Sequence, residues 1–171
     1  MLPMAIAVIL HELAHLAVLH ILNGRIKSFG AAPFGLCIEY DSSSLSLKGE
    51  ALVKAAGGII NLFFAAASVV LYCIFRVDLL NFGIVSFLVA LVNLIPAEPL
   101  DGGKLLHLGI ASAFNPFVAC KVSAIVTYVF GFMIFLFSSY MLLTSVSGIY
   151  PLLFSVYIFV CNSKTLEKVY L

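Results

Sequence analysis

The chain has 171 residues, of which 63% are apolar and only 10% are Asp, Glu, Lys or Arg, and its mean hydropathy is +1.18. Soluble domains carry about 25% charged residues, so this composition excludes a water-soluble globule and indicates a bilayer protein. The net charge of +1 leaves no basic surface for phosphates, which excludes a nucleic-acid partner. The four cysteines form no CxxC pair and therefore indicate neither a disulfide framework nor a thiolate metal site.

The first apolar stretch, residues 1 to about 22, is long enough to cross a hydrocarbon core. It differs from a signal peptide, whose central region is uniformly apolar, because it contains His11, Glu12, His15 and His20. We predict a transmembrane helix that carries polar side chains.

Residues 23–50 mix glycine, proline and serine with short apolar pieces. Within them, Arg25 to Phe29 and Phe34 to Tyr40 are typical of two short strands around a Gly/Pro turn. Backbone polar groups near lipid must be paired, so we expect a small interfacial β-hairpin between the first and second transmembrane helices.

The remaining apolar stretches predict four further spans. Residues 55–75 and 79–97 contain no charged residue and flank a short turn at Arg76 to Asp78, which predicts a helical hairpin. Residues 101–121 form a polar break. Residues 122–163 again lack charge and fit two crossings with a turn at Thr144 to Pro151, although whether the last stretch spans fully stays open.

Together these elements predict an all-α polytopic membrane protein with about five transmembrane helices and one small hairpin. We expect a single domain over residues 1–171, with a core at 1–110 and accessory spans at 117–163. The positive-inside rule sets its orientation. The side with the first loop, the third loop and the C-terminus is rich in cations, whereas the opposite side has Arg76; the cations are Arg25, Lys27, Lys48, Lys104, Lys121, Lys164 and Lys168. The N-terminus is therefore expected outside and the C-terminus in the cytoplasm.

Residues 11–15 (HELAH) form an HExxH motif. Residues four apart share one face of an α-helix, so His11 and His15 can hold one Zn²⁺ while Glu12, about 100° round the axis, acts on a water at the metal. In an ordinary helix such a motif also arises by chance as a solvated face. Inside a membrane span a glutamate costs about 2.5 to 3.5 kcal/mol, which disfavours chance.

Two histidines leave a catalytic zinc one protein ligand short. Glu98 and Asp101 are the acidic candidates at the end of the third apolar stretch, where two prolines and two glycines are expected to break the helix and let a carboxylate turn inward. For Asp101 a helix-capping role is the alternative. The other acidic residues lie in the polar loop or in the outer turn: Glu39, Asp41, Glu50 and Asp78.

Four motifs in this order resemble the site-2 protease family (peptidase family M50) of intramembrane zinc metalloproteases. They are HELAH at 11–15, GGIIN at 57–61, NLIP at 93–96 and LDG at 100–102, and the resemblance covers residues 1 to about 110. It implies that His11, His15 and Asp101 ligate one Zn²⁺ per chain and that Glu12 is the catalytic base. Asn61 and Asn93 occupy positions where the family has polar residues near the active site, either contacting substrate or forming interhelical hydrogen bonds.

The resemblance implies hydrolysis of a peptide bond in or next to a transmembrane segment of a membrane-protein substrate. Regulated intramembrane proteolysis of a transcription or sigma factor precursor in a bacterial cell membrane is the corresponding process, with the active site toward the cytoplasm. The chain is most similar in size to the compact sporulation-type branch. It has Gly57 and Gly58 where the family often has Gly-Pro. No PDZ or CBS domain is visible, so a regulatory module is expected either on another protein, such as a membrane partner, or not at all.

The alternative is a zinc-binding membrane adaptor (a pseudoprotease) or a metal transporter without proteolytic activity. Only a hydrolase needs the glutamate between the histidines. A transporter is expected to carry polar residues along the later spans, yet residues 122–163 offer hydroxyl groups and one asparagine. For the hairpin near residues 25–40, pairing with an extended substrate and plugging the membrane surface both remain open.

Overall fold

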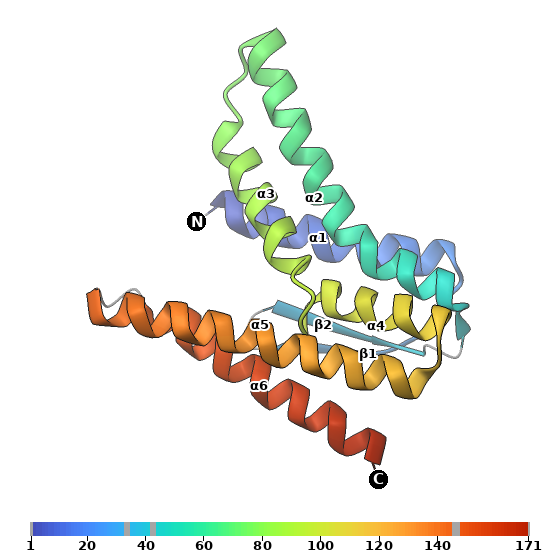
Figure 1. Ribbon diagram of the computed structural model, residues 1–171. Helices are drawn as coiled ribbons and strands as arrows, with labels where there is room; N and C mark the ends of the chain where they lie inside the picture. Colours follow the sequence, from blue (N-terminus) through green and yellow to red (C-terminus); the bar gives the residue numbers. More distant parts are fainter. Residues whose placement is uncertain (1, 33–34, 42–43, 145–147, 171) are drawn as a thin grey trace. The chain divides into compact units, whose positions relative to one another are not determined.

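The computed structural model describes residues 2–32, 35–41, 44–144 and 148–170. In these residues the chain forms six α-helices and two β-strands, which confirms the predicted all-α membrane fold with a small hairpin (Figure 1). The elements are α1 (Leu2–Ile21), β1 (Ile26–Ala32), β2 (Gly35–Tyr40), α2 (Leu47–Phe75), α3 (Leu80–Asn93), α4 (Asp101–Ala113), α5 (Pro116–Thr144) and α6 (Ile149–Tyr170).

The helices correspond to the predicted spans, with one addition and two changed ends: α2 begins at Leu47 instead of residue 55, and α3 ends at Asn93 instead of residue 97. By length and composition α1, α2 and α5 can cross a membrane, while α3 and residues Ile149–Ser163 of α6 are shorter apolar helices. The segment that we expected as a polar break, 101–121, instead contains α4 and the start of α5. Of the turn expected at Thr144 to Pro151, residues 145–147 lie outside the described residues; Thr144 ends α5 and Pro151 lies within α6.

Among the described residues, many large apolar side chains are exposed and several polar side chains are buried, unlike in a soluble protein. Large apolar side chains are exposed, including Leu2, Phe63 and Phe137 at 73%, 62% and 61%. The buried polar side chains are His11, His15, Asn61, Ser68, Ser86, Ser123, Thr127, Ser138, Ser155 and Asn162. Small and polar residues between helices with large apolar residues outside are typical of helices packed in lipid, and the chain is a multi-pass membrane protein.

The chain divides into two compact units, residues 1–93 and 94–171. In the first unit α2 packs along α3, and α1 packs against both. In the second unit α5 packs against α4 and α6. A single domain over residues 1–171 stays a prediction.

The β-hairpin forms where the sequence predicts it. β1 and β2 pair antiparallel, with Phe29 opposite Ile38 and an irregularity between Ile26 and Ser28. Residues 33–34 lie outside the described residues, including Phe34, at which we expected the second strand to begin. The Nζ of Lys54 lies 5.0 Å from the Tyr40 ring centroid, which links the end of the hairpin to α2.

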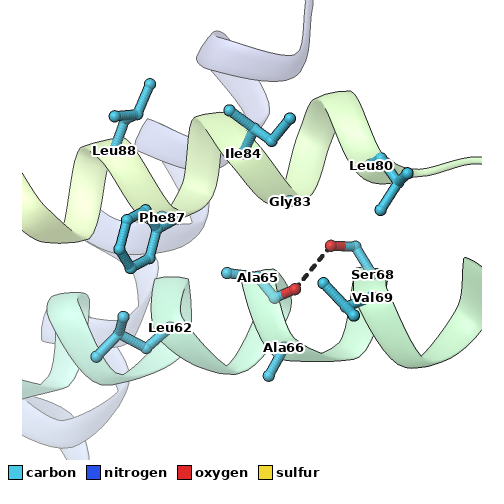
Figure 2. A pocket seen from close by; sticks show the side chains of 10 residues that line it. All are labelled: Leu62, Ala65, Ala66, Ser68, Val69, Leu80, Gly83, Ile84, Phe87 and Leu88. Carbon is cyan, nitrogen blue, oxygen red and sulfur yellow. Dashed lines mark hydrogen bonds between the residues drawn. The ribbon is translucent and has the colours of Figure 1, made fainter.

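The predicted α2–α3 turn is also confirmed. Arg76 ends α2 in the left-handed conformation with φ of 56°. The Asp78 carboxylate accepts a hydrogen bond from the Leu80 N–H at 3.4 Å, where α3 begins. Between the two helices lies an apolar pocket of about 480 Å³, where Gly83 of α3 faces Ser68 of α2 (Figure 2).

Candidate metal centre

The histidines of the HExxH motif lie on the buried face of α1. The buried residues of this helix are Ala7, His11, His15 and Leu19, four apart along the chain. His11 is 3% exposed and His15 is 7% exposed. Glu12, one position on, is half-buried. The 3.6-residue period therefore gives the two imidazoles one face and sets the carboxylate beside them, as the sequence predicts.

The facing surface of α2 repeats the same spacing with Val53, Gly57 and Asn61, all buried. Nδ1 of His15 lies 2.6 Å from the carbonyl oxygen of Val53. Nδ1 of His11 lies 3.2 Å from Nδ2 of Asn61. α2 therefore holds the Nδ1 side of both rings.

The opposite ring nitrogens converge. The Nε2 atoms of His11 and His15 are 3.1 Å apart, with the rings edge to face at 82°. Two nitrogens on a tetrahedral zinc, each at about 2.0 to 2.1 Å, lie about 3.3 Å apart, so the pair fits two ligands of one ion.

Gly57 leaves room at this point. A Cβ on Gly57 would lie 2.5 Å from Nε2 of His15 and 2.6 Å from Nε2 of His11. No side chain larger than hydrogen therefore fits here without moving the rings or the helix.

In the second unit, Asp101 is the first residue of α4 and is half-buried. Residues 94–100 fold back across the first turn of this helix: a Cβ on Gly102 would lie 2.6 Å from the Ile95 oxygen, and one on Gly103 would lie 2.5 Å from the Glu98 nitrogen. The Glu98 N–H also donates to Thr127 Oγ1 at 3.1 Å.

The expected helix break is confirmed at residues 94–100, where both prolines lie, but the expectation that the two glycines contribute to it is wrong. The glycines lie inside the first turn of α4, where the absence of side chains lets the preceding loop pack directly on the helix backbone. The N-cap position of α4 is Leu100, which makes no side-chain capping bond.

The structure brings together His11, His15 and Asn61 in the first unit. Asp101 lies in the second unit, at the start of α4. Asn93 ends α3, and its Nδ2 donates to the Val89 carbonyl at 3.0 Å, so this bond lies within one helix. His20 is exposed at the end of α1. Sequence reasoning missed the Val53 carbonyl and the close approach at Gly57; the spacing 53, 57, 61, parallel to 11 and 15, was the available signal.

Comparison with known proteins agrees with these observations. The model for "Peptidase family M50" matches residues 77–137, a range that includes Asn93 and Asp101. Stage IV sporulation protein FB of Bacillus subtilis (strain 168) is 33% identical over 112 residues, or 63% of this chain. The match spans 39% of that protein's length.

A solved structure shares the fold. The site-2 protease from Methanocaldococcus jannaschii superimposes with a TM-score of 0.72 at 20% sequence identity, over 96% of this chain and 76% of that one.

Proposed function

We propose that this chain, which belongs to the site-2 protease family (peptidase family M50), is a zinc metalloendopeptidase that hydrolyses a peptide bond in or next to a transmembrane segment of a membrane protein. The observation that carries the proposal is the pair of buried imidazoles whose Nε2 atoms lie 3.1 Å apart on a helix long and apolar enough to cross a membrane.

The proposed ligands of one Zn²⁺ are His11, His15 and Asp101, each of which offers one ligand atom. Two imidazoles and one carboxylate form a donor set that catalytic zinc sites use, with a further position left for water or substrate. Asp101 is half-buried in the first turn of α4, and this position supports its assignment because the carboxylate is partly shielded from solvent.

Zinc supplies Lewis acidity: when bound, it activates water at neutral pH and stabilises negative charge on the peptide carbonyl. Glu12 is the proposed general base. Its carboxylate takes a proton from the attacking water and returns it to the leaving nitrogen. The position of Glu12 on α1, one residue after His11, supports this role, because the carboxylate starts beside the proposed ligands.

The proposed substrate is a membrane protein, cleaved on the cytoplasmic side of a bacterial membrane in regulated proteolysis of the sporulation type, under control of a membrane partner. A substrate helix must unwind to expose its peptide bond, because its backbone groups are otherwise paired. In the described residues the sheet has two strands, β1 and β2, so an extended substrate segment has an edge to pair with. Asn93 is a proposed substrate contact.

The test is cleavage of a membrane-tethered substrate by purified protein in liposomes, with zinc content measured in parallel. Glu12→Gln is expected to lower the cleavage rate by about 10²- to 10⁴-fold and to keep the zinc, because it removes the base and leaves the ligands. Glu50→Gln, the same change in the first turn of α2, is the control and is expected to cleave normally. Full cleavage by Glu12→Gln would contradict the mechanism, and zinc-loaded wild type that cleaves no substrate would favour the adaptor alternative.

Asp101→Asn tests the third ligand in the same preparation. The amide is a weaker and neutral donor, so zinc content and cleavage are both expected to fall. Retention of full zinc content with wild-type activity would remove Asp101 from the ligand set.

A further inference from the structure

The two histidines are held at Nδ1 by groups of different kinds. Nδ1 of His15 lies 2.6 Å from the Val53 carbonyl oxygen. A carbonyl oxygen only accepts, so this Nδ1 carries the ring hydrogen and Nε2 keeps its lone pair. A metal ligand needs that lone pair, so the backbone of α2 fixes His15 in the form that binds zinc through Nε2.

His11 faces a side chain that can play either role. Asn61 is fully buried, and its carboxamide has two ends of equal shape, one a donor and one an acceptor. With Nδ2 toward His11 Nδ1, at 3.2 Å, the ring hydrogen is on Nε2, where a metal would bind. With Oδ1 in that place, Nδ1 carries the hydrogen and Nε2 keeps the lone pair that a metal ligand needs.

Without a metal, hydrogen bonding favours the first orientation, because the Nε2 atoms of the two histidines are 3.1 Å apart and His11 Nε2–H can then donate to His15 Nε2. Oδ1 of Asn61 has no partner among the described residues in that orientation, and turning the amide leaves Nδ2 in the same position. In the zinc-bound site the requirement for a lone pair on His11 Nε2 decides instead. It favours Oδ1 toward the ring and leaves the N–H₂ end for a water or carbonyl oxygen.

We propose that Asn61 is a positioning residue whose Oδ1 accepts a hydrogen bond from His11 Nδ1–H and holds His11 in the tautomer that binds zinc through Nε2. This inference rests on the proposed zinc site. It gives α2 one role toward both ligands: the Val53 carbonyl orients His15, the Asn61 amide orients His11, and Gly57 between them leaves the space that both Nε2 atoms face.

The test compares zinc affinity of purified variants by competition with a chelator. Asn61→Ala is expected to bind zinc about 10- to 100-fold more weakly, the usual loss when a group that orients a ligand is removed. Asn61→Asp is expected to keep wild-type affinity, because a carboxylate oxygen accepts the same hydrogen. Asn162→Ala is the matched control: Asn162 is 1% exposed and donates to the Ala124 carbonyl at 3.2 Å, and its loss is expected to leave zinc affinity unchanged.

Nitrogen-15 resonances of the histidine rings give a second measurement that simple loss of packing would not reproduce. In zinc-loaded wild type and Asn61→Asp, the His11 proton is expected on Nδ1. Wild-type affinity in Asn61→Ala, equal weakening in Asn61→Asp, or a His11 proton on Nε2 in the zinc-loaded protein would each overturn the inference. Wild type that binds no zinc would instead refute the proposed zinc site itself.

Discussion

Gly57 and Gly83, both in the first unit, each face a neighbouring helix, but only Gly57 faces proposed metal ligands. Gly57 of α2 faces the rings of α1, and a Cβ there would lie 2.5 Å from His15 Nε2. Gly83 of α3 faces α2, and a Cβ there would lie 2.8 Å from Ser68 Cβ and closer still to Ser68 Oγ. In both places the absence of a side chain leaves room for a side chain of the facing helix. Small residues of this kind are common where membrane helices pack.

The difference lies in what the facing groups do with their hydrogen-bonding capacity. Ser68 Oγ donates within its own helix, to the Ala65 carbonyl at 2.8 Å, and its surroundings are apolar (Figure 2). The two histidines instead use Nδ1 for α2 and direct Nε2 into the gap. A glycine at a helix interface therefore allows close packing in both places. Only at Gly57 do two ring nitrogens also face the space beside the glycine, so only there can a metal bind.

Among the variants that distinguish Gly57 from Gly83, Gly57→Ala is expected to have the largest effect on zinc affinity. The added methyl group must displace the ring nitrogens, so zinc affinity is expected to fall by about 10- to 100-fold. Chelator competition measures this change. Gly109→Ala in α4 is the control, because a Cβ there meets nothing within 4 Å, and it is expected to leave zinc affinity unaltered. Unchanged zinc affinity in Gly57→Ala would remove the distinction drawn between the two glycines.

Gly83→Ala is expected to affect stability and to leave zinc affinity intact. Overpacking costs typically about 1 to 3 kcal/mol, partly offset by the better helix propensity of alanine. The measurement is the thermal midpoint in detergent micelles, with zinc affinity recorded on the folded protein. A loss of zinc affinity as large as that of Gly57→Ala would show that both interfaces serve the site.

The smallest effect is expected in the double variant Gly83→Ala with Ser68→Ala. Removing Oγ takes away the closest contact but leaves Cβ of residue 68 at 2.8 Å from the new methyl group, so the double variant is expected to recover only part of the stability lost in Gly83→Ala. A double-mutant cycle of unfolding midpoints measures this coupling. Additive losses would mean that Ser68 does not limit the approach of α3. No equivalent rescue exists at Gly57, because truncating either histidine removes a proposed ligand.

Most of the fold follows from local patterns. Uncharged stretches marked the apolar helices, and the Gly/Pro-rich segment marked the β-hairpin. The sequence does not predict α4, because Gly102 and Gly103 are poor helix formers. Their effect depends on a contact with residues 94–98, and such a contact is not visible in glycine propensity.

The sequence alone determined that the solvent is lipid and that two histidines share one helix face with a glutamate beside them. Both results depend on composition and on the 3.6-residue period, which are properties of the chain itself. Only the tertiary structure decided that Val53, Gly57 and Asn61 meet those histidines. A backbone carbonyl has no sequence signature, and the register between α1 and α2 is set by packing, so the partner of Asn61 became clear only when the helices were placed against each other.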